Sequence, residues 1–289
     1  MPAVRKTPWS NNSRKGIVKG QPLNPSAAIE QRYYLPLRTL IDRMIADTEH
    51  ELDKLFKTEH AEEYFAQDGP GYAQDASISS QARILTNALI KKYTDLFASL
   101  SKPMAERFAE ESDKSSDVAV KSSIRQLSDT LTLSTKTITS GPLNDILSAT
   151  ITENVGLIKS IPAQYLNGVQ GAVMRSITTG NGMQDLVPYL QKHKGITLRR
   201  ARMISMDQTR KAFNSLSKAR MEKANIREYE WLHTSGSRHP RKLHIAMNGN
   251  IYKYSDPPII DEKTGERGIP GQAINCACRM RPIISFNED

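Results

Sequence analysis

The sequence is poor in cysteine, with Cys276 and Cys278 as the only two among 289 residues. Two cysteines cannot build the framework of several disulfides that small secreted domains use, so an oxidising compartment loses support. Aromatic residues are also scarce, at 6%, although 38% hydrophobic residues are enough to bury a core. A chain of this length forms one large domain or two ordinary ones.

Long apolar runs are absent as well. No stretch approaches the roughly 18 apolar residues that a transmembrane helix needs. The residues after Met1 are Pro, Ala, Val, Arg and Lys, which do not start the apolar region of a signal peptide. We therefore expect no membrane partner, and a protein that stays in a reducing cytoplasm or in an assembly formed there.

The net charge of +9 is unevenly distributed. Residues 1–22 carry five basic and no acidic side chains, and residues 23–120 carry 11 basic and 17 acidic ones. Residues 121–190 are nearly balanced, whereas residues 191–289 carry 19 basic and 10 acidic side chains. This asymmetry favours contact with a polyanion or an acidic protein surface, although it also serves plain solubility.

Composition and periodicity divide the chain into four segments. Residues 1–27 are rich in Pro, Gly, Ser, Asn and bases, which predicts an extended basic arm, either free or laid over a partner. Residues 28–140 predict a helical domain, and residues 141–225 predict further helices. Residues 226–289 alternate and turn like strands. The expected fold is α+β: a predominantly helical body with a small C-terminal β-rich unit.

The helices are predicted from apolar residues at the i, i+3, i+4, i+7 spacing. The predicted ranges are 37–58, 78–100, 103–111, 116–134, 143–161, 162–178, 185–193 and 197–224. Three of the breaks rest on local signals. Pro103 and Pro162 suit the first turn of a new helix, and Thr197, after Gly195, can cap the last one.

The β-rich unit is predicted from three runs of alternating residues. "REYEWLHTS" (227–235) and "AINCACRMRPIISF" (273–286) each read as a strand. "IAMNGNIYKYS" (245–255) places Asn-Gly between two such runs, which predicts a hairpin.

Several motifs follow one another in the C-terminal half. They are "ENVGLIKSIP" (153–162), "GNGMQDLVPYLQKH" (180–193), "GITLRRARMISMDQTRKAFN" (195–214), "EWLHTSGSRHPR" (230–241), "HIAMNG" (244–249) and "PGQAINCACRMRP" (270–282). In this order, over about residues 141–286, the chain resembles the phage head morphogenesis, or minor head, proteins, also called the phage Mu F-like family. The last motif is the most specific, and residues 141–225 would be the helical part of the head-morphogenesis domain.

The resemblance implies a structural minor head (capsid) protein of a tailed bacteriophage. Such a protein would lie in the virion, at the capsid interior or the portal vertex, and in the host cytoplasm during assembly. It would act in head assembly or in DNA packaging or delivery. The implied partners are the portal protein, the major capsid or scaffolding protein, and phage DNA bound without sequence preference. Some toxin-like proteins carry the same module, but we expect binding and no enzymatic activity.

The segment 191–223 is strongly basic. Its candidate contact residues for nucleic acid or an acidic partner are Arg199, Arg200, Arg202, Arg210, Lys211 and Lys218. They do not share one helical face, so they predict a generally basic surface whose phosphate contacts would be sequence-independent. Alternatively, residues 185–224 read as a helix-turn-helix, which would make the chain a sequence-specific DNA-binding protein.

The two cysteines are candidates for a metal site. In a strand, Cys276 and Cys278 point to the same face with Cα atoms roughly 6.6 Å apart, which strains a disulfide. With His239 and His244 they would form a structural Cys₂His₂ zinc site, although the usual spacing of the cysteines is C-x₂₋₄-C. The alternative is that they pack as small apolar side chains.

The histidines allow one further hypothesis. His233, His239 and His244 could form an acid–base set flanked by Glu228 and Glu230. No Ser or Cys lies in a recognisable nucleophile setting beside them. A hydrolase or nuclease is therefore the third alternative, and we assign no catalytic residue and no cofactor apart from the candidate zinc.

Overall fold

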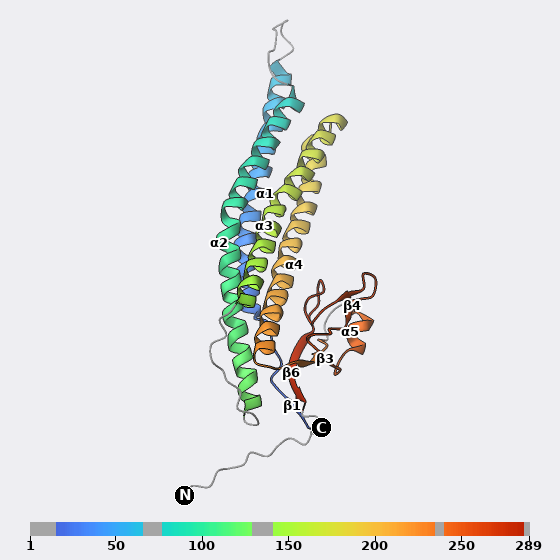
Figure 1. Ribbon diagram of the computed structural model, residues 1–289. Helices are drawn as coiled ribbons and strands as arrows, with labels where there is room; N and C mark the ends of the chain where they lie inside the picture. Colours follow the sequence, from blue (N-terminus) through green and yellow to red (C-terminus); the bar gives the residue numbers. More distant parts are fainter. Residues whose placement is uncertain (1–15, 66–76, 129–140, 235–239, 286–289) are drawn as a thin grey trace. The chain divides into compact units, whose positions relative to one another are not determined.

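The computed structural model describes residues 16–65, 77–128, 141–234 and 240–285 (Figure 1). Its helices are α1 (Ala27–Phe65), α2 (Ile78–Ser128), α3 (Gly141–Thr179), α4 (Met183–Lys223) and the short α5 (Lys242–Ala246). Its strands are β1 (Ile17–Lys19), β2 (Glu228–Leu232), β3 (Ile251–Lys253), β4 (Ile259–Asp261), β5 (Glu266–Arg267) and β6 (Arg279–Ser285). The predicted α+β class is confirmed.

The chain forms two compact units. Unit 1 comprises Met1–Pro25, Lys114–Leu143 and Phe213–Asp289, and unit 2 comprises Ser26–Asp113 and Asn144–Ala212. Helices α2 and α4 supply residues to both units. Among the described residues, none of the helices combines the length and apolar character that a membrane-crossing segment requires.

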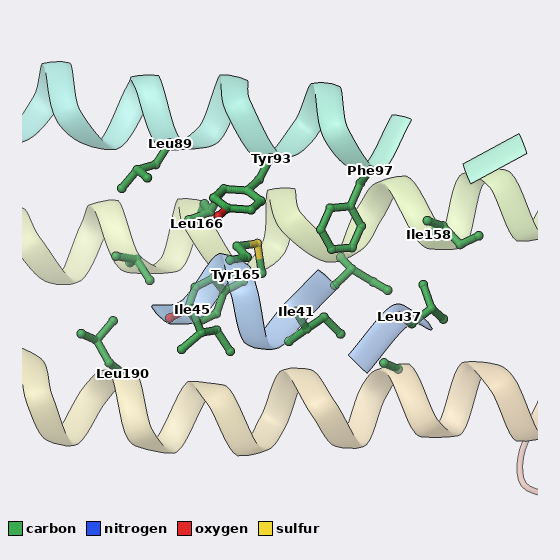
Figure 2. Packing of buried hydrophobic residues seen from close by; sticks show 14 of the residues in the cluster. Leu37, Ile41, Ile45, Leu89, Tyr93, Phe97, Ile158, Tyr165, Leu166 and Leu190 are labelled. Atoms are coloured by element: carbon green, nitrogen blue, oxygen red, sulfur yellow. The ribbon is translucent and has the colours of Figure 1, made fainter. Parts of the chain in front are cut away.

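Unit 2 is a bundle of four helical segments. Buried residues from all four helices point toward one another in its core (Figure 2). They include Leu37, Ile41 and Ile45 of α1, Leu89, Tyr93 and Phe97 of α2, Ile158, Tyr165 and Leu166 of α3, and Leu190 of α4. This spacing every three or four residues is the pattern that predicted the helices.

The predicted helix breaks at Pro103 and Pro162 are wrong, because α2 and α3 run through both prolines. A proline inside a helix costs about 3 kcal/mol, since it removes one backbone hydrogen bond and crowds the preceding turn. In α2, however, the buried Phe97 and Phe108 lie three turns apart on either side of Pro103. Burial of this continuous apolar stripe offsets the local cost.

The predicted break at Gly195 is also wrong, and with it the helix-turn-helix. Residues 183–223 form the single helix α4. The Thr197 hydroxyl does not cap a helix N-terminus, because it donates a hydrogen bond to the carbonyl of His193, one turn earlier, at 2.8 Å. A glycine within a helix costs only about 1 kcal/mol, which does not end the helix. The chain turns between α3 and α4, where Gly180 and Gly182 have positive φ.

Unit 1 contains a four-stranded antiparallel sheet with strand order β1-β6-β2-β3 and a separate β4-β5 pair. The described end of the predicted basic arm belongs to this sheet. Val18 of β1 pairs with Ile284 of β6, and the Leu23 backbone bridges to Met280. Residues 17–23 therefore lie against the chain's own C-terminal strand. The rest of the arm, residues 1–15, is outside the described residues.

The predicted hairpin around Asn248-Gly249 is wrong. The residues before it form α5 and a turn, with hydrogen bonds from Met247 N to Leu243 O and from Asn248 N to Ile245 O. Gly249, at φ 82°, then lets the chain enter β3, which pairs with β2. The Asn-Gly pair thus joins a helical turn to a strand.

Candidate functional site

Cys276 and Cys278 lie in the loop that leads into β6, and both are buried and free of disulfide bonds. The prediction that they belong to the strand itself is wrong, since β6 begins at Arg279. The loop is shaped by left-handed backbone at Gly271 (φ 83°) and Asn275 (φ 58°). The Cys276 amide then donates to the carbonyl of Ala273 at 2.9 Å. This turn brings both thiols into the core of unit 1.

His244 of α5 faces the two thiols. Its Nδ1 lies 3.5 Å from Cys276 Sγ and 3.8 Å from Cys278 Sγ. The ligand atoms of these three residues all lie within 4.8 Å of one another. Within the described ranges, they form the only group of three or more His, Cys, Asp or Glu side chains with such spacing.

The orientation of His244 is set by its second nitrogen. Nε2 lies 3.0 Å from the carbonyl oxygen of Ile260. Because a carbonyl oxygen only accepts hydrogen bonds, Nε2 carries a proton, and Nδ1 is directed at the sulfurs. The buried Trp231 ring, whose centroid lies 5.2 Å from that of the imidazole in an edge-to-face arrangement, further holds His244 in place.

His233 also lies beside Cys278. Its Nδ1 is 3.5 Å from Cys278 Sγ, and its backbone N–H donates to Asn248 Oδ1 at 2.8 Å. The pairing of β2 with β6 explains the position, because Leu232 pairs with Arg279 and the next residues in register are His233 and Cys278. The ring of His239, predicted as a ligand, lies outside the described residues.

The environment shifts the pKa values of the two thiols in opposite directions. The hydrogen bond from Cys278 lowers the pKa of Cys276; burial opposes this effect, and His244 and the backbone N–H groups of Cys278 and Gly271 reinforce it. The same hydrogen bond and burial raise the pKa of Cys278. Burial disfavours the charged His244 ring, but its contacts with Cys276 and Ile260 outweigh burial and raise its pKa. The surroundings therefore favour the thiolate form of Cys276 over that of Cys278.

The two carboxylates near these histidines in the sequence are engaged elsewhere. Glu230 is buried and accepts from Lys19 at 2.8 Å and from Arg281 at 3.2 Å. Glu228 accepts from the Ser285 hydroxyl at 2.6 Å. The cluster thus offers two thiols and two imidazoles, which is a ligand set for a soft metal ion.

The six basic candidates all lie on α4, but their surroundings differ. Arg200 donates to Ser160 Oγ at 2.8 Å, and burial lowers its pKa. Lys211 pairs with Glu153 at 3.7 Å and Lys218 with Glu222 at 3.9 Å. Arg210 is partly buried. Arg199 and Arg202 are exposed, as are Lys192 and Lys194 of the same helix. The accessible positive charge of α4 therefore lies mainly in residues 192–202.

Buried polar contacts in unit 2 were not predicted from the sequence. The Tyr33 hydroxyl donates to Asn154 Oδ1 at 2.7 Å, and Asn154 Nδ2 donates to Gln208 Oε1 at 3.0 Å. These three side chains come from α1, α3 and α4. These hydrogen bonds fix the register of the helices and do not form a reactive site, because each of the three side chains has a hydrogen-bond partner.

Comparison with known proteins confirms the resemblance seen in the sequence. Residues 167–281 match the family described as "Phage Mu protein F like protein". This range contains α4, β2, β3, the first residues of β6, and all four residues of the His/Cys cluster. Over 277 residues the chain is 27% identical to a protein of Haemophilus influenzae described only as "Uncharacterized protein". The alignment covers 96% of this chain and 58% of that protein. No solved structure matches the chain significantly.

Proposed function

We propose that this chain is a structural minor head protein of a tailed bacteriophage, which acts at the portal or the capsid interior during head assembly or DNA delivery. The observation that carries the proposal is the match of residues 167–281 to the Phage Mu protein F like family. The chain spans 58% of the length of the Haemophilus influenzae protein that it matches. The proposed role therefore concerns this chain and not the whole of that longer protein.

Binding rather than turnover accounts best for the polar residues of unit 1. The Nδ1 atoms of His233 and His244 face thiols, and Glu230 is held by two cations. A general base must reach the proton that it abstracts, and these groups are directed at one another. The same contacts suit a module that keeps its shape while other surfaces bind.

The exposed part of α4 is a candidate binding surface. Lys192, Ile196, Arg199 and Met203 follow at spacings of three and four residues, so they share one helical face. Ile196 and Met203 are 40% and 41% exposed. Bases mixed with accessible apolar groups suit an acidic protein surface or a phosphate backbone better than plain solvent.

Fractionation of assembled particles tests the function. We expect the chain to leave with purified heads, and to remain with the portal when the heads are opened and the DNA is released. A chain found only among unassembled proteins would contradict the proposal.

Charge reversal tests the α4 surface. We expect the double variant Arg199→Glu, Arg202→Glu to lose salt-sensitive binding to DNA, or to heads that lack the chain. Each basic side chain that contacts a phosphate contributes to the affinity and to its dependence on salt. The matched control is Arg83→Glu with Lys91→Glu, which reverses two exposed bases on α2. Equal loss in both double variants would show that net charge, and not this surface, governs binding.

A further inference from the structure

We propose that His233, His244, Cys276 and Cys278 bind one zinc ion as a closed structural site in unit 1. The site is independent of the proposed role in the phage head. It replaces the sequence-based ligand His239 by His233, and it draws its ligands from three places: the end of β2, helix α5 and the loop before β6.

The distances between ligand atoms match a tetrahedral ion. Zn–S bonds of about 2.3 Å and Zn–N bonds of about 2.0–2.1 Å separate sulfur from nitrogen by about 3.5–3.6 Å. Three of the four sulfur–nitrogen distances are 3.5, 3.5 and 3.8 Å. His244, Cys276 and Cys278 can therefore hold a zinc ion with little rearrangement, whereas His233, which contacts Cys278 but lies outside this closest group, has to turn toward the ion.

Such distances also suit S–H···N hydrogen bonds, but the convergence of the groups favours a metal. His244 Nδ1 lies within 3.8 Å of both sulfurs, and the three ligand atoms lie within 4.8 Å of one another in the core of unit 1. Metal binding would release the thiol protons and let one cation bind these donors together.

The surroundings of the cluster supply the second shell that zinc ligands use. The Ile260 carbonyl accepts from His244 Nε2, the arrangement that orients a metal-binding histidine. The backbone N–H groups of Gly271 and Cys278 are hydrogen-bond partners of the Cys276 sulfur. Gly271 lies at φ 83°, where a side chain is strained, which explains a glycine at this point of the loop.

The donor set identifies both the ion and its role. Two thiolates and two imidazoles in a tetrahedron are the ligands of zinc, whereas carboxylate and carbonyl oxygens would suit magnesium or calcium. Four protein ligands leave no position for water or substrate, so the ion would be structural. The C-x-C spacing is unusual for zinc, but here a turn at Ala273–Cys276 positions the two sulfurs. They do not follow the geometry of a regular strand.

Metal analysis of the purified full-length chain tests the site. We expect about one zinc per chain and, after replacement by Co²⁺, the absorption bands of a tetrahedral ion with thiolate ligands. Less than about a tenth of an equivalent of zinc after incubation of the reduced chain with zinc would overturn the proposal. A Cys276–Cys278 disulfide in protein kept under reducing conditions would also overturn it.

Variants test the fourth ligand. We expect His233→Ala to weaken zinc binding by at least about 100-fold, more than the loss of a second-shell group. His50→Ala replaces an exposed histidine of α1 and serves as the matched control. If His233→Ala misfolds, zinc titration of the metal-stripped wild-type chain still decides the site. Unchanged affinity and Co²⁺ spectrum in folded His233→Ala would overturn the assignment of His233.

Discussion

The two units bury their cores by different means. In unit 2 the apolar residues recur along four helical segments, so each helix presents a continuous stripe to the others. In unit 1 the core combines helix ends with short strands and loops, and its contacts join residues far apart in sequence, such as Leu23 and Met280. A region built from short elements depends more on individual polar links, and on an ion where one binds, than a bundle does.

The largest expected effect of a single substitution is in the unit 2 core. Phe97 is fully buried, so we expect Phe97→Ala to lower the free energy of unfolding by about 3–5 kcal/mol through lost burial and the cavity left behind. Urea denaturation of the full chain measures it. Ile84→Ala on the same helix is the control, because Ile84 is 64% exposed and should change stability by less than about 0.5 kcal/mol. Similar losses in both variants would mean that the α2 stripe does not hold the bundle.

A smaller effect is expected at a polar link of unit 1. Glu230→Gln removes the charge that joins Lys19 of β1 to Arg281 of β6. We expect a loss of about 1–2 kcal/mol, because Glu230 is buried but its partners remain partly in water. Thermal unfolding compares it with Glu228→Gln, whose carboxylate is less buried. A larger loss for Glu228→Gln would contradict the importance of the Glu230 link.

The smallest expected effect is a gain. Gly195→Ala should stabilise the chain by about 0.5–1 kcal/mol, because Gly195 lies within α4 and a methyl group there meets nothing within 4 Å. Gly180→Ala should do the opposite, since Gly180 has φ 76°. Circular dichroism melts measure both. Destabilisation by Gly195→Ala would contradict a continuous α4 and would support a turn at Gly195, as a helix-turn-helix requires.

The sequence predicts the helices well where periodicity carries the signal and poorly where single residues suggest a break. Pro103, Pro162 and Gly195 are local signals with costs of about 1–3 kcal/mol. Burial along the stripes on either side exceeds those costs, so the helices continue. Such competition is decided by packing, which a local pattern does not contain.

The His/Cys cluster is only partly predictable for a related reason. Cys276, Cys278 and His244 stand out by their chemistry, and the structure brings them together. His233 becomes a neighbour of Cys278 through the register of β2 and β6, which could have been found by pairing "EWLH" with "CRM". The contact of Tyr33 with Asn154 spans 121 residues, and no pattern in the sequence signals it.

Amide hydrogen exchange of the full chain, with and without a zinc chelator, tests most directly the claim that a bound ion holds the loops of unit 1 in place. We predict faster exchange on chelation in residues 228–234, 240–249 and 271–285, with unchanged protection of 27–57 and 144–179. Exchange that is the same with and without the chelator, or that rises equally in both units, would contradict this account.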